Sequence, residues 1–140
     1  MEKMQNERVE KALEMHKKGY NCAQCVACAY GDLAGIDEKT AFRMAEGFGA
    51  GMGNFQGTCG ALTGAYLLAG LATDGSGMEG PKTKQETYKK VKALGKQFAE
   101  KNGSVICADL KGMNGGPVLR SCDGCIEDAA ILAAELFHAE

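Results

Sequence analysis

The chain has no tryptophan, only two prolines among 140 residues, and almost no net charge. Its 16 lysine and arginine residues are offset by 18 aspartate and glutamate residues, which leaves a formal charge of −2. Nucleic-acid binding relies on a basic excess that neutralises phosphates, so this composition argues against it. Because 45% of the residues are hydrophobic and the net charge is small, the composition also excludes a natively disordered chain.

Long hydrophobic runs are also missing. The longest, residues 59–73, is short of the ~20 residues that span a bilayer and is interrupted by glycines, so we expect a buried core helix and no membrane insertion. The first eight residues are charged and lack the apolar core of a signal peptide. We therefore expect a cytoplasmic protein.

The sequence is rich in glycine, and many of its segments have the apolar spacing of a helix. The chain contains 20 glycines, about twice the usual share, and several stretches with helical apolar spacing end at one of them. No segment alternates like a strand, so we predict one all-α domain over residues 1–140, a bundle of about five to seven helices. The first helix is expected to end near Gly19, and others to cover about 22–33, 37–47, 58–73, 83–101 and the region from 121 onward, with a short one at 104–110. Residues 47–57 are expected to form a glycine-rich loop, and residues 74–81 a flexible crossing.

Seven cysteines are the unusual feature of the composition. In a reducing cytosol, an odd number of cysteines indicates metal ligands or redox-active thiols rather than structural disulfides. Cys22, Cys59 and Cys122 each follow a good N-capping residue (Asn21, Thr58 and Ser121), which predicts that they occupy the first turn of a helix. Free amides and the helix dipole there favour a thiolate or an anionic iron–sulfur cluster. Cys107 has Ser104 three residues before it and fits the pattern less clearly.

Cysteine pairs with Cys-x-x-Cys spacing suggest an alternative. Cys22 and Cys25, together with Cys122 and Cys125, could form a tetrahedral zinc site, although the gap between the pairs is longer than in ordinary zinc modules. The βαβ context of thioredoxin is missing, and no such pair is followed by the histidine that c-type haem attachment requires.

The glycine-rich segment does not match a phosphate-binding motif. Position 54 is asparagine where a dinucleotide fingerprint has its third glycine, and no Gly-Lys-Ser/Thr motif occurs. We interpret the glycines as allowing backbone to approach a helix or an inorganic cofactor closely. The residues predicted to contact such a cofactor are Gly49, Gly51, Gly53 and Gly60.

The order of these motifs resembles the C_GCAxxG_C_C family of small redox-active proteins. The resemblance covers nearly the whole chain. It rests on residues 19–24, 47–53, 59–64 and 107–112, and on Cys122 with the Glu-Asp-Ala-Ala sequence at 127–130. It implies that the four family cysteines are Cys22, Cys59, Cys107 and Cys122, while Cys25, Cys28 and Cys125 are additions. A related domain occurs in split-Soret cytochromes, which also hold a non-haem iron–sulfur site, so the resemblance suggests a cluster here.

Three hypotheses follow. In the first, the four family cysteines bind an iron–sulfur cluster and pass electrons to a redox partner. In the second, no metal is bound and Cys22 or Cys59 is the attacking thiolate in dithiol–disulfide exchange. In the third, a zinc ion bound by the four Cys-x-x-Cys residues (Cys22, Cys25, Cys122 and Cys125, the zinc set) makes the domain a structural interaction module. The sequence does not decide whether the protein is an enzyme, or whether two copies pair through the apolar, glycine-containing helix at 59–73.

Overall fold

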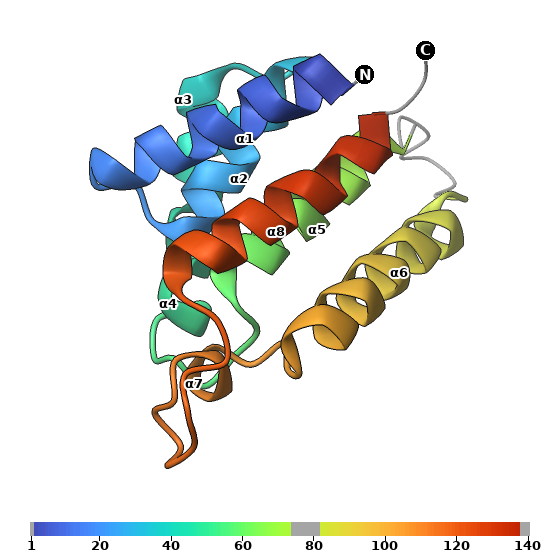
Figure 1. Ribbon diagram of the computed structural model, residues 1–140. Coiled ribbons are helices and arrows are strands. Elements are labelled where there is room, and N and C mark those ends of the chain that lie inside the picture. The colour runs from blue at the N-terminus through green and yellow to red at the C-terminus, as the bar shows by residue number, and fades with distance from the viewer. Residues whose placement is uncertain (1, 74–81, 138–140) are drawn as a thin grey trace.

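The computed structural model describes residues 2–73 and 82–137, and within these ranges the chain is almost entirely helical (Figure 1). The α-helices are α1 (Glu2–Lys17), α2 (Cys22–Tyr30), α3 (Glu38–Ala45), α4 (Gly49–Met52), α5 (Gly60–Ala72), α6 (Lys84–Asn102), α7 (Cys107–Leu110) and α8 (Cys122–Ala134). Short 3₁₀ turns cover Gly31–Ala34, Glu46–Phe48 and Glu135–Phe137. In the described ranges the one β-type pairing is an isolated antiparallel bridge between Thr58 and Ile106. The all-α prediction is confirmed, and the predicted crossing at 74–81 lies outside the described residues.

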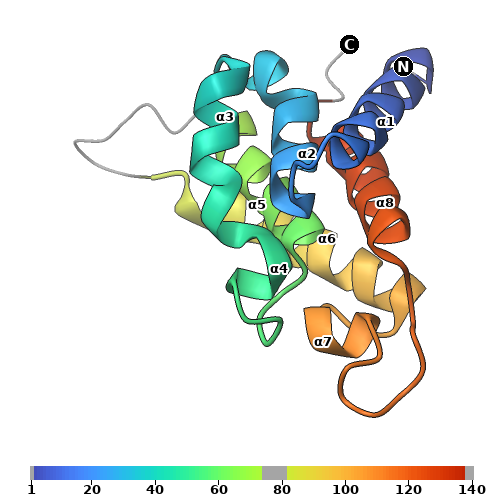
Figure 2. The ribbon, with the colours of Figure 1, turned by 90° about the vertical axis from the view of Figure 1, so that its left-hand side faces the viewer.

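Helix α2 lies at the centre of the bundle and packs against α1, α3, α5 and α8. It is buried from its second residue to its last, and the Tyr30 hydroxyl at its end donates a hydrogen bond to the Ala130 carbonyl oxygen of α8 at 2.7 Å. Figures 1 and 2 show that α2, α5 and α8 all begin at the end of the bundle where α4 and α7 lie. Segments distant in sequence therefore present their helix N-termini in the same region.

Helix α5 corresponds to the apolar run that the sequence predicted to be a core helix. Leu62 and Leu68 are fully buried, and the helix packs against α2, α6 and α8. No helix in the described part of the chain combines the length and the apolar character needed to cross a membrane.

The start of α5 differs from the sequence prediction. Thr58 was expected to cap the helix with Cys59 as the first helical residue, but Cys59 is itself the N-cap, with φ −50° and ψ 132°. Thr58 is held in the bridge with Ile106, so it is part of an extended pairing and cannot cap α5. The cysteine nevertheless stays at the helix N-terminus.

The glycine-rich segment consists of tight irregular turns, as its composition predicts. A 3₁₀ turn leads into α4, which is a single kinked turn because Ala50 and Gly51 are left-handed, with φ 51° and 55°. Met52 and Phe55 also have positive φ values, 69° and 67°. Three non-glycine residues in this conformation within six positions mark a strained loop, and such strain concentrates at functional sites.

Candidate functional site: a cluster of thiols around a lysine

A short backbone pairing brings Cys59 and Cys107 side by side. The Cys59 amide donates to the Val105 carbonyl oxygen at 2.7 Å, and the Cys107 amide donates to the Gly57 carbonyl oxygen at 2.9 Å. The isolated bridge described above belongs to the same pairing. As a result, the starts of α5 and α7 adjoin although they are far apart in sequence.

Cys22 reaches the same region from the start of α2. Asn21 and Gln24 form a capping box there, with both hydrogen bonds at 2.9 Å, which fixes the first turn of the helix. A Cβ atom built on Gly60 would lie 2.5 Å from the Cys22 sulfur, so this sulfur packs against the beginning of α5. Cys22 is thus a direct neighbour of the segment that carries Cys59.

Cys122 is supplied by the start of α8. The hydroxyl of Ser121 caps this helix by accepting a hydrogen bond from the Gly124 amide at 3.0 Å, as the sequence predicted. Lys111, which directly follows α7, donates a hydrogen bond from Nζ to the Cys122 sulfur. This contact links Cys122 to the short helix that begins at Cys107.

The four family cysteines share one electrostatic environment with Lys111. Burial is the main cause that raises the pKa of Cys22 and of Cys107, and neighbouring thiols of the set raise both further. Lys111 acts in the opposite direction and lowers the pKa of Cys22, Cys59 and Cys107. Burial disfavours the Lys111 ammonium, but its hydrogen bond to Cys122 and the nearby thiols raise its pKa. The contact of Cys22 with Gly60, the backbone pairing of Cys59 with Cys107, and the hydrogen bond of Lys111 to Cys122 connect these residues, which we call the thiol–lysine site.

Cys125 adds a fifth sulfur that the iron–sulfur prediction did not include. The neighbouring Cys125 thiol is the main cause that lowers the pKa of Cys59 to about 7. Burial opposes that shift, whereas the amides of Ala61 and Leu62 at the N-terminus of α5 reinforce it. Cys59 and burial both raise the pKa of Cys125, so Cys59 is the thiol of the two that ionises more readily. The spacing from Cys122 had indicated Cys125 only as a zinc ligand.

Cys25 and Cys28 belong to the core of the bundle. Their sulfurs donate to the carbonyl oxygens of Tyr20 and Glu38, both at 3.7 Å. Burial is the main cause that raises the pKa of Cys25 to about 12 and that of Cys28 to about 11. Both are therefore protonated thiols at neutral pH.

Among the residues that the structure describes, no three histidine, cysteine, aspartate or glutamate side chains are arranged to hold one metal ion. This finding covers the four family cysteines and the zinc set of Cys22, Cys25, Cys122 and Cys125 alike. A metal role for either set remains a prediction.

Three of the four glycines predicted to contact a cofactor pack against a cysteine of this cluster or against Asn21, the residue that caps the helix of Cys22. A Cβ atom on Gly51 would lie 2.5 Å from the Cys107 Cβ, and one on Gly49 would lie 2.5 Å from the Asn21 Cγ. Gly60 contacts the Cys22 sulfur, as described above. Gly53 has no neighbour within 4 Å at that position, and its φ of 89° shows that it serves the turn. Close packing of backbone against cysteines accounts for these glycines, and direct contact with a cofactor remains a prediction.

The strained loop lies against the site, because Gly51 packs on Cys107. The backbone amide of Ala50, one of its left-handed residues, lowers the pKa of the Cys22 thiol. Sulfur ligands in iron–sulfur proteins accept hydrogen bonds from backbone amides. The strained loop is therefore next to two cysteines of the cluster, Cys22 and Cys107.

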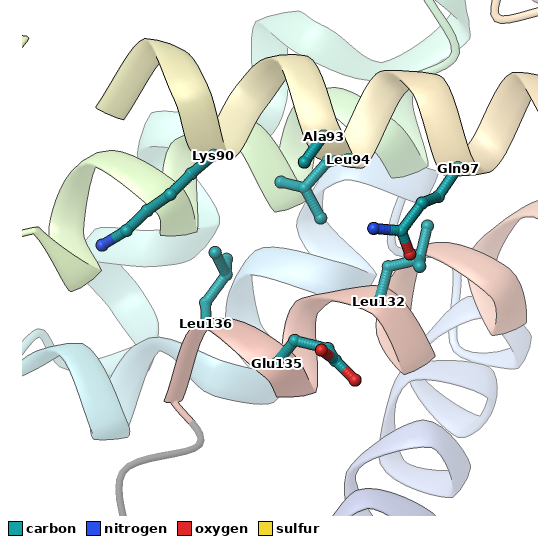
Figure 3. Close-up of a pocket in the computed structure, with 7 residues that line it drawn as sticks. All are labelled: Lys90, Ala93, Leu94, Gln97, Leu132, Glu135 and Leu136. Carbon is teal, nitrogen blue, oxygen red and sulfur yellow. The ribbon is translucent and has the colours of Figure 1, made fainter. Parts of the chain in front are cut away.

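A separate pocket lies between α6 and α8 (Figure 3). It has a volume of about 220 Å³ and is lined by Leu94 and Lys90 of α6 on one side, and by Leu132 near the end of α8 and Leu136 of the following 3₁₀ turn on the other. No cysteine lines it. The pocket is therefore distinct from the thiol–lysine site.

An all-α bundle that gathers thiols and an ammonium group at one end has the features of a redox protein based on cysteine chemistry. Residues 20–136 match the model of a family described as "Putative redox-active protein (C_GCAxxG_C_C)", and the chain belongs to this family. Comparisons with curated proteins and with solved structures found no match.

Proposed function

We propose that this protein transfers electrons through an iron–sulfur cluster bound by Cys22, Cys59, Cys107 and Cys122. The observation that carries the proposal is that these four cysteines start or adjoin four separate helices at one end of the bundle. Backbone pairing joins Cys59 to Cys107, the Cys22 sulfur packs against Gly60, and Lys111 links Cys122 to the end of α7. The proposal includes a redox partner protein or a small electron donor or acceptor, and a cytoplasmic location.

The donor set fits such a cluster in its chemistry. Four cysteine thiolates are the usual ligands of two-iron and four-iron clusters, which distribute them over several iron atoms. A single tetrahedral ion instead requires all of its sulfurs at about 2.3 Å, an arrangement that the described residues do not adopt. Cys22, Cys59, Cys107 and Cys122 supply four such thiols, so the donor set fits a cluster in its chemistry.

The surrounding groups would tune the site. When bound, a cluster would supply one-electron transfer. The chain itself contributes the positive charge of Lys111, the amide of Ala50 at Cys22, and the amides of Ala61 and Leu62 at Cys59. Hydrogen bonds to sulfur and nearby positive charge both stabilise added negative charge, which is how proteins adjust cluster potentials.

The proposal is tested by metal and sulfide analysis of protein purified without oxygen. We expect visible absorbance and about two to four irons per chain, the stoichiometry of clusters with four thiolate ligands. Serine substitution of each family cysteine should reduce the iron content, whereas Cys28→Ser, a buried cysteine outside the cluster, should retain it. Protein that contains no iron and cannot be reconstituted would overturn the proposal. Zinc in place of iron would favour a zinc site formed by Cys22, Cys25, Cys122 and Cys125.

A second candidate, dithiol–disulfide chemistry without a metal, is favoured by one specific observation. The pKa of Cys59 is lowered to about 7, which makes it the most readily ionised thiol whose shift is resolved. A thiolate at neutral pH is the attacking species in disulfide exchange. Metal-free protein should then contain one cysteine that alkylates rapidly at pH 7, identified as Cys59 by peptide mapping. Uniformly slow alkylation of all seven cysteines would contradict this candidate.

A further inference from the structure

Two exposed, uncharged loops lie at the end of the bundle that holds the cysteines. Residues 52–56 and 113–119 are exposed without a break. Neither run contains an aspartate, glutamate, lysine or arginine, although 24% of the chain is charged. Of the nine large hydrophobic side chains that are exposed in the described part of the chain, five belong to these runs, which we call the apolar loops: Met52, Phe55, Met113, Val118 and Leu119.

Helix α7 fastens both apolar loops beside the cysteines. The Ala108 amide donates to the Phe55 carbonyl oxygen at 2.8 Å, and the Ala108 carbonyl oxygen accepts from the Met113 amide at 2.8 Å. The Leu119 amide donates to the Leu110 carbonyl oxygen at 2.9 Å. Figures 1 and 2 show both loops next to α7, at the end of the bundle where α2, α5 and α8 begin. The apolar loops therefore adjoin the thiol–lysine site.

Two apolar residues of the first loop are held in a strained conformation without being buried. Met52 and Phe55 have φ values of 69° and 67°, and their exposed fractions are 38% and 36%. A left-handed conformation is costly for side chains of this size, and such strain concentrates where a protein binds ligands or partners. Burial does not offset that cost as fully as it would for enclosed side chains, which indicates a use for the exposed surface.

We propose that the apolar loops are the docking surface for a partner protein that carries its own redox cofactor and meets them with an apolar, uncharged face. The surface would serve the electron-transfer role proposed above, on which this assignment rests. Interface centres are enriched in methionine and aromatic residues and depleted of charge, as these loops are. Pro117 and Leu119 also line a hollow of about 230 Å³ beside α7, and such hollows are where anchoring side chains of a partner bind.

The size and charge of the apolar loops favour this occupant over two others. The two runs contain twelve residues, whereas a standard stable interface uses about 20–30 residues a side and weak electron-transfer encounters lie at the small end of the range. A stable pair of copies of this chain is therefore disfavoured. Neither run carries a basic residue, and basic residues commonly draw a protein surface to anionic lipid. A membrane surface is therefore disfavoured as well.

Photocrosslinking in the cells that naturally produce the protein tests the surface and its partner. The photoreactive residue p-benzoylphenylalanine replaces Val118, which is 65% exposed, and in the matched control it replaces Tyr88, which is 59% exposed on α6. Crosslinked products are identified by mass spectrometry. We expect position 118 to capture a flavin, haem or iron–sulfur protein that position 88 does not. A crosslink to a second copy of the chain, to lipid or to a protein without a redox cofactor would overturn the proposal, as would none at all.

Binding of the purified pair is the second measurement. The double variant Met113→Ser/Val118→Ser should weaken the Kd for the identified partner about tenfold or more, because two central apolar contacts are lost. Tyr88→Ser should bind like wild type. Raising NaCl from about 50 to about 500 mM should change the Kd by less than about threefold, since the loops carry no charge to screen. Unchanged affinity in the double variant, with its fold verified by circular dichroism, or a steep dependence on salt would overturn the proposal.

The docking surface and the iron–sulfur cluster fail separately in these experiments. The crosslink at Val118 is read whether or not a cluster is bound, so iron-free protein would remove the cluster and leave the docking result standing. Protein with the expected iron content but no crosslink at Val118 would remove the docking surface alone.

Discussion

The Nζ atom of Lys111 donates a hydrogen bond to the sulfur of Cys122, and this contact places an ammonium group among thiols from four segments of the chain. A buried cluster of thiols resists ionisation because each thiolate loses hydration and repels the next. Lys111 offsets part of that cost and lowers the pKa of Cys22, Cys59 and Cys107. Its positive charge therefore favours the ionised form of these three thiols, alongside the larger effects of burial and of the Cys125 side chain on Cys59.

Replacing Lys111 should suppress thiolate formation at Cys59. In Lys111→Met the pKa of Cys59 should rise, and a rise of about one unit from 7 would reduce the thiolate fraction at pH 7 about fivefold. The rate of Cys59 alkylation by iodoacetamide, followed by peptide mapping between pH 6 and 9, measures this shift. Lys111→Arg should retain most of the effect. Lys96→Met, which removes an exposed lysine paired with Glu100, should alkylate like wild type, and an unshifted profile in Lys111→Met would refute the assigned role.

The lowered pKa of Cys59 also predicts how stability depends on pH. Between pH 7 and about 9, folded Cys59 is largely deprotonated while the unfolded thiol still holds its proton. The unfolded state then binds more protons, so this residue makes the free energy of unfolding rise with pH in that window. Above about pH 9 the trend should reverse, because the raised pKa values of Cys25 and Cys28 mean that unfolding then releases protons.

Urea unfolding of reduced, metal-free protein at several pH values tests this dependence. Comparison with Cys59→Ser isolates the contribution of Cys59, because the variant should lack the rise between pH 7 and 9. Cys28→Ser should keep the rise and lose part of the fall above pH 9. Parallel curves for wild type and Cys59→Ser would show that the folded and unfolded pKa values of this thiol are equal.

A buried carboxylate should stabilise the segment that leads into Cys122. Asp128 accepts hydrogen bonds from Lys101 at 2.6 Å, Arg120 at 3.0 Å and Asn102 at 3.2 Å, and its side chain is only 2% exposed. Asp128→Ala removes the bonds from all three residues, including a second one from Arg120 at 3.2 Å, and leaves the buried Asn102 amide without this acceptor. We expect the free energy of unfolding to fall by about 2–3 kcal/mol, the range for hydrogen bonds to charged groups. Glu100→Gln, an exposed control, should change it by less than about 0.5 kcal/mol.

The same carboxylate predicts loss of stability in acid. Burial opposes the charge of Asp128, but its hydrogen bonds outweigh that cost and hold its pKa below the usual value of 3.8. Its contribution is complete above that pH and is lost as the pH falls through the lower folded value. The stability difference between wild type and Asp128→Ala should therefore shrink as the pH falls below 3.8, as chemical denaturation can measure. A constant difference down to pH 2 would mean that ionisation of Asp128 does not contribute.

Local signals were sufficient to predict most of the helices. Asn21 and Ser121 cap α2 and α8 as expected, and Gly35 and Gly103 follow their helices in the left-handed conformation. Thr58 does not cap α5, because its pairing with Ile106, which is distant in sequence, holds its backbone extended. A capping preference of about 1 kcal/mol is easily overridden by such tertiary pairing.

The candidate site was only partly predictable for the same reason. The capping pattern and the family resemblance pointed to cysteines at helix starts, since both depend on neighbouring residues in the sequence. Lys111 and the pairing of Cys59 with Cys125 depend on how α5, α7 and α8 pack, and no local pattern encodes those contacts. The Cys-x-x-Cys spacing indicated Cys125 as a zinc ligand, a role that stays a prediction. It could not indicate Cys59 as a neighbour, because spacing along one helix does not show which other helix lies opposite.

Two glycines of α5 should respond in opposite ways to the same substitution. In Gly60→Ala the new Cβ would lie 2.5 Å from the Cys22 sulfur and 3.0 Å from the Gly49 Cα, so the thiol–lysine site must shift. We expect a loss of about 1–3 kcal/mol in the free energy of unfolding, the usual cost of overpacking, and a changed alkylation rate at Cys22. Gly70, near the other end of the helix, has nothing within 4 Å, so Gly70→Ala should stabilise by up to about 1 kcal/mol through helix propensity. Equal effects of the two variants on stability would show that Gly60 is not needed for close packing at the cysteine site.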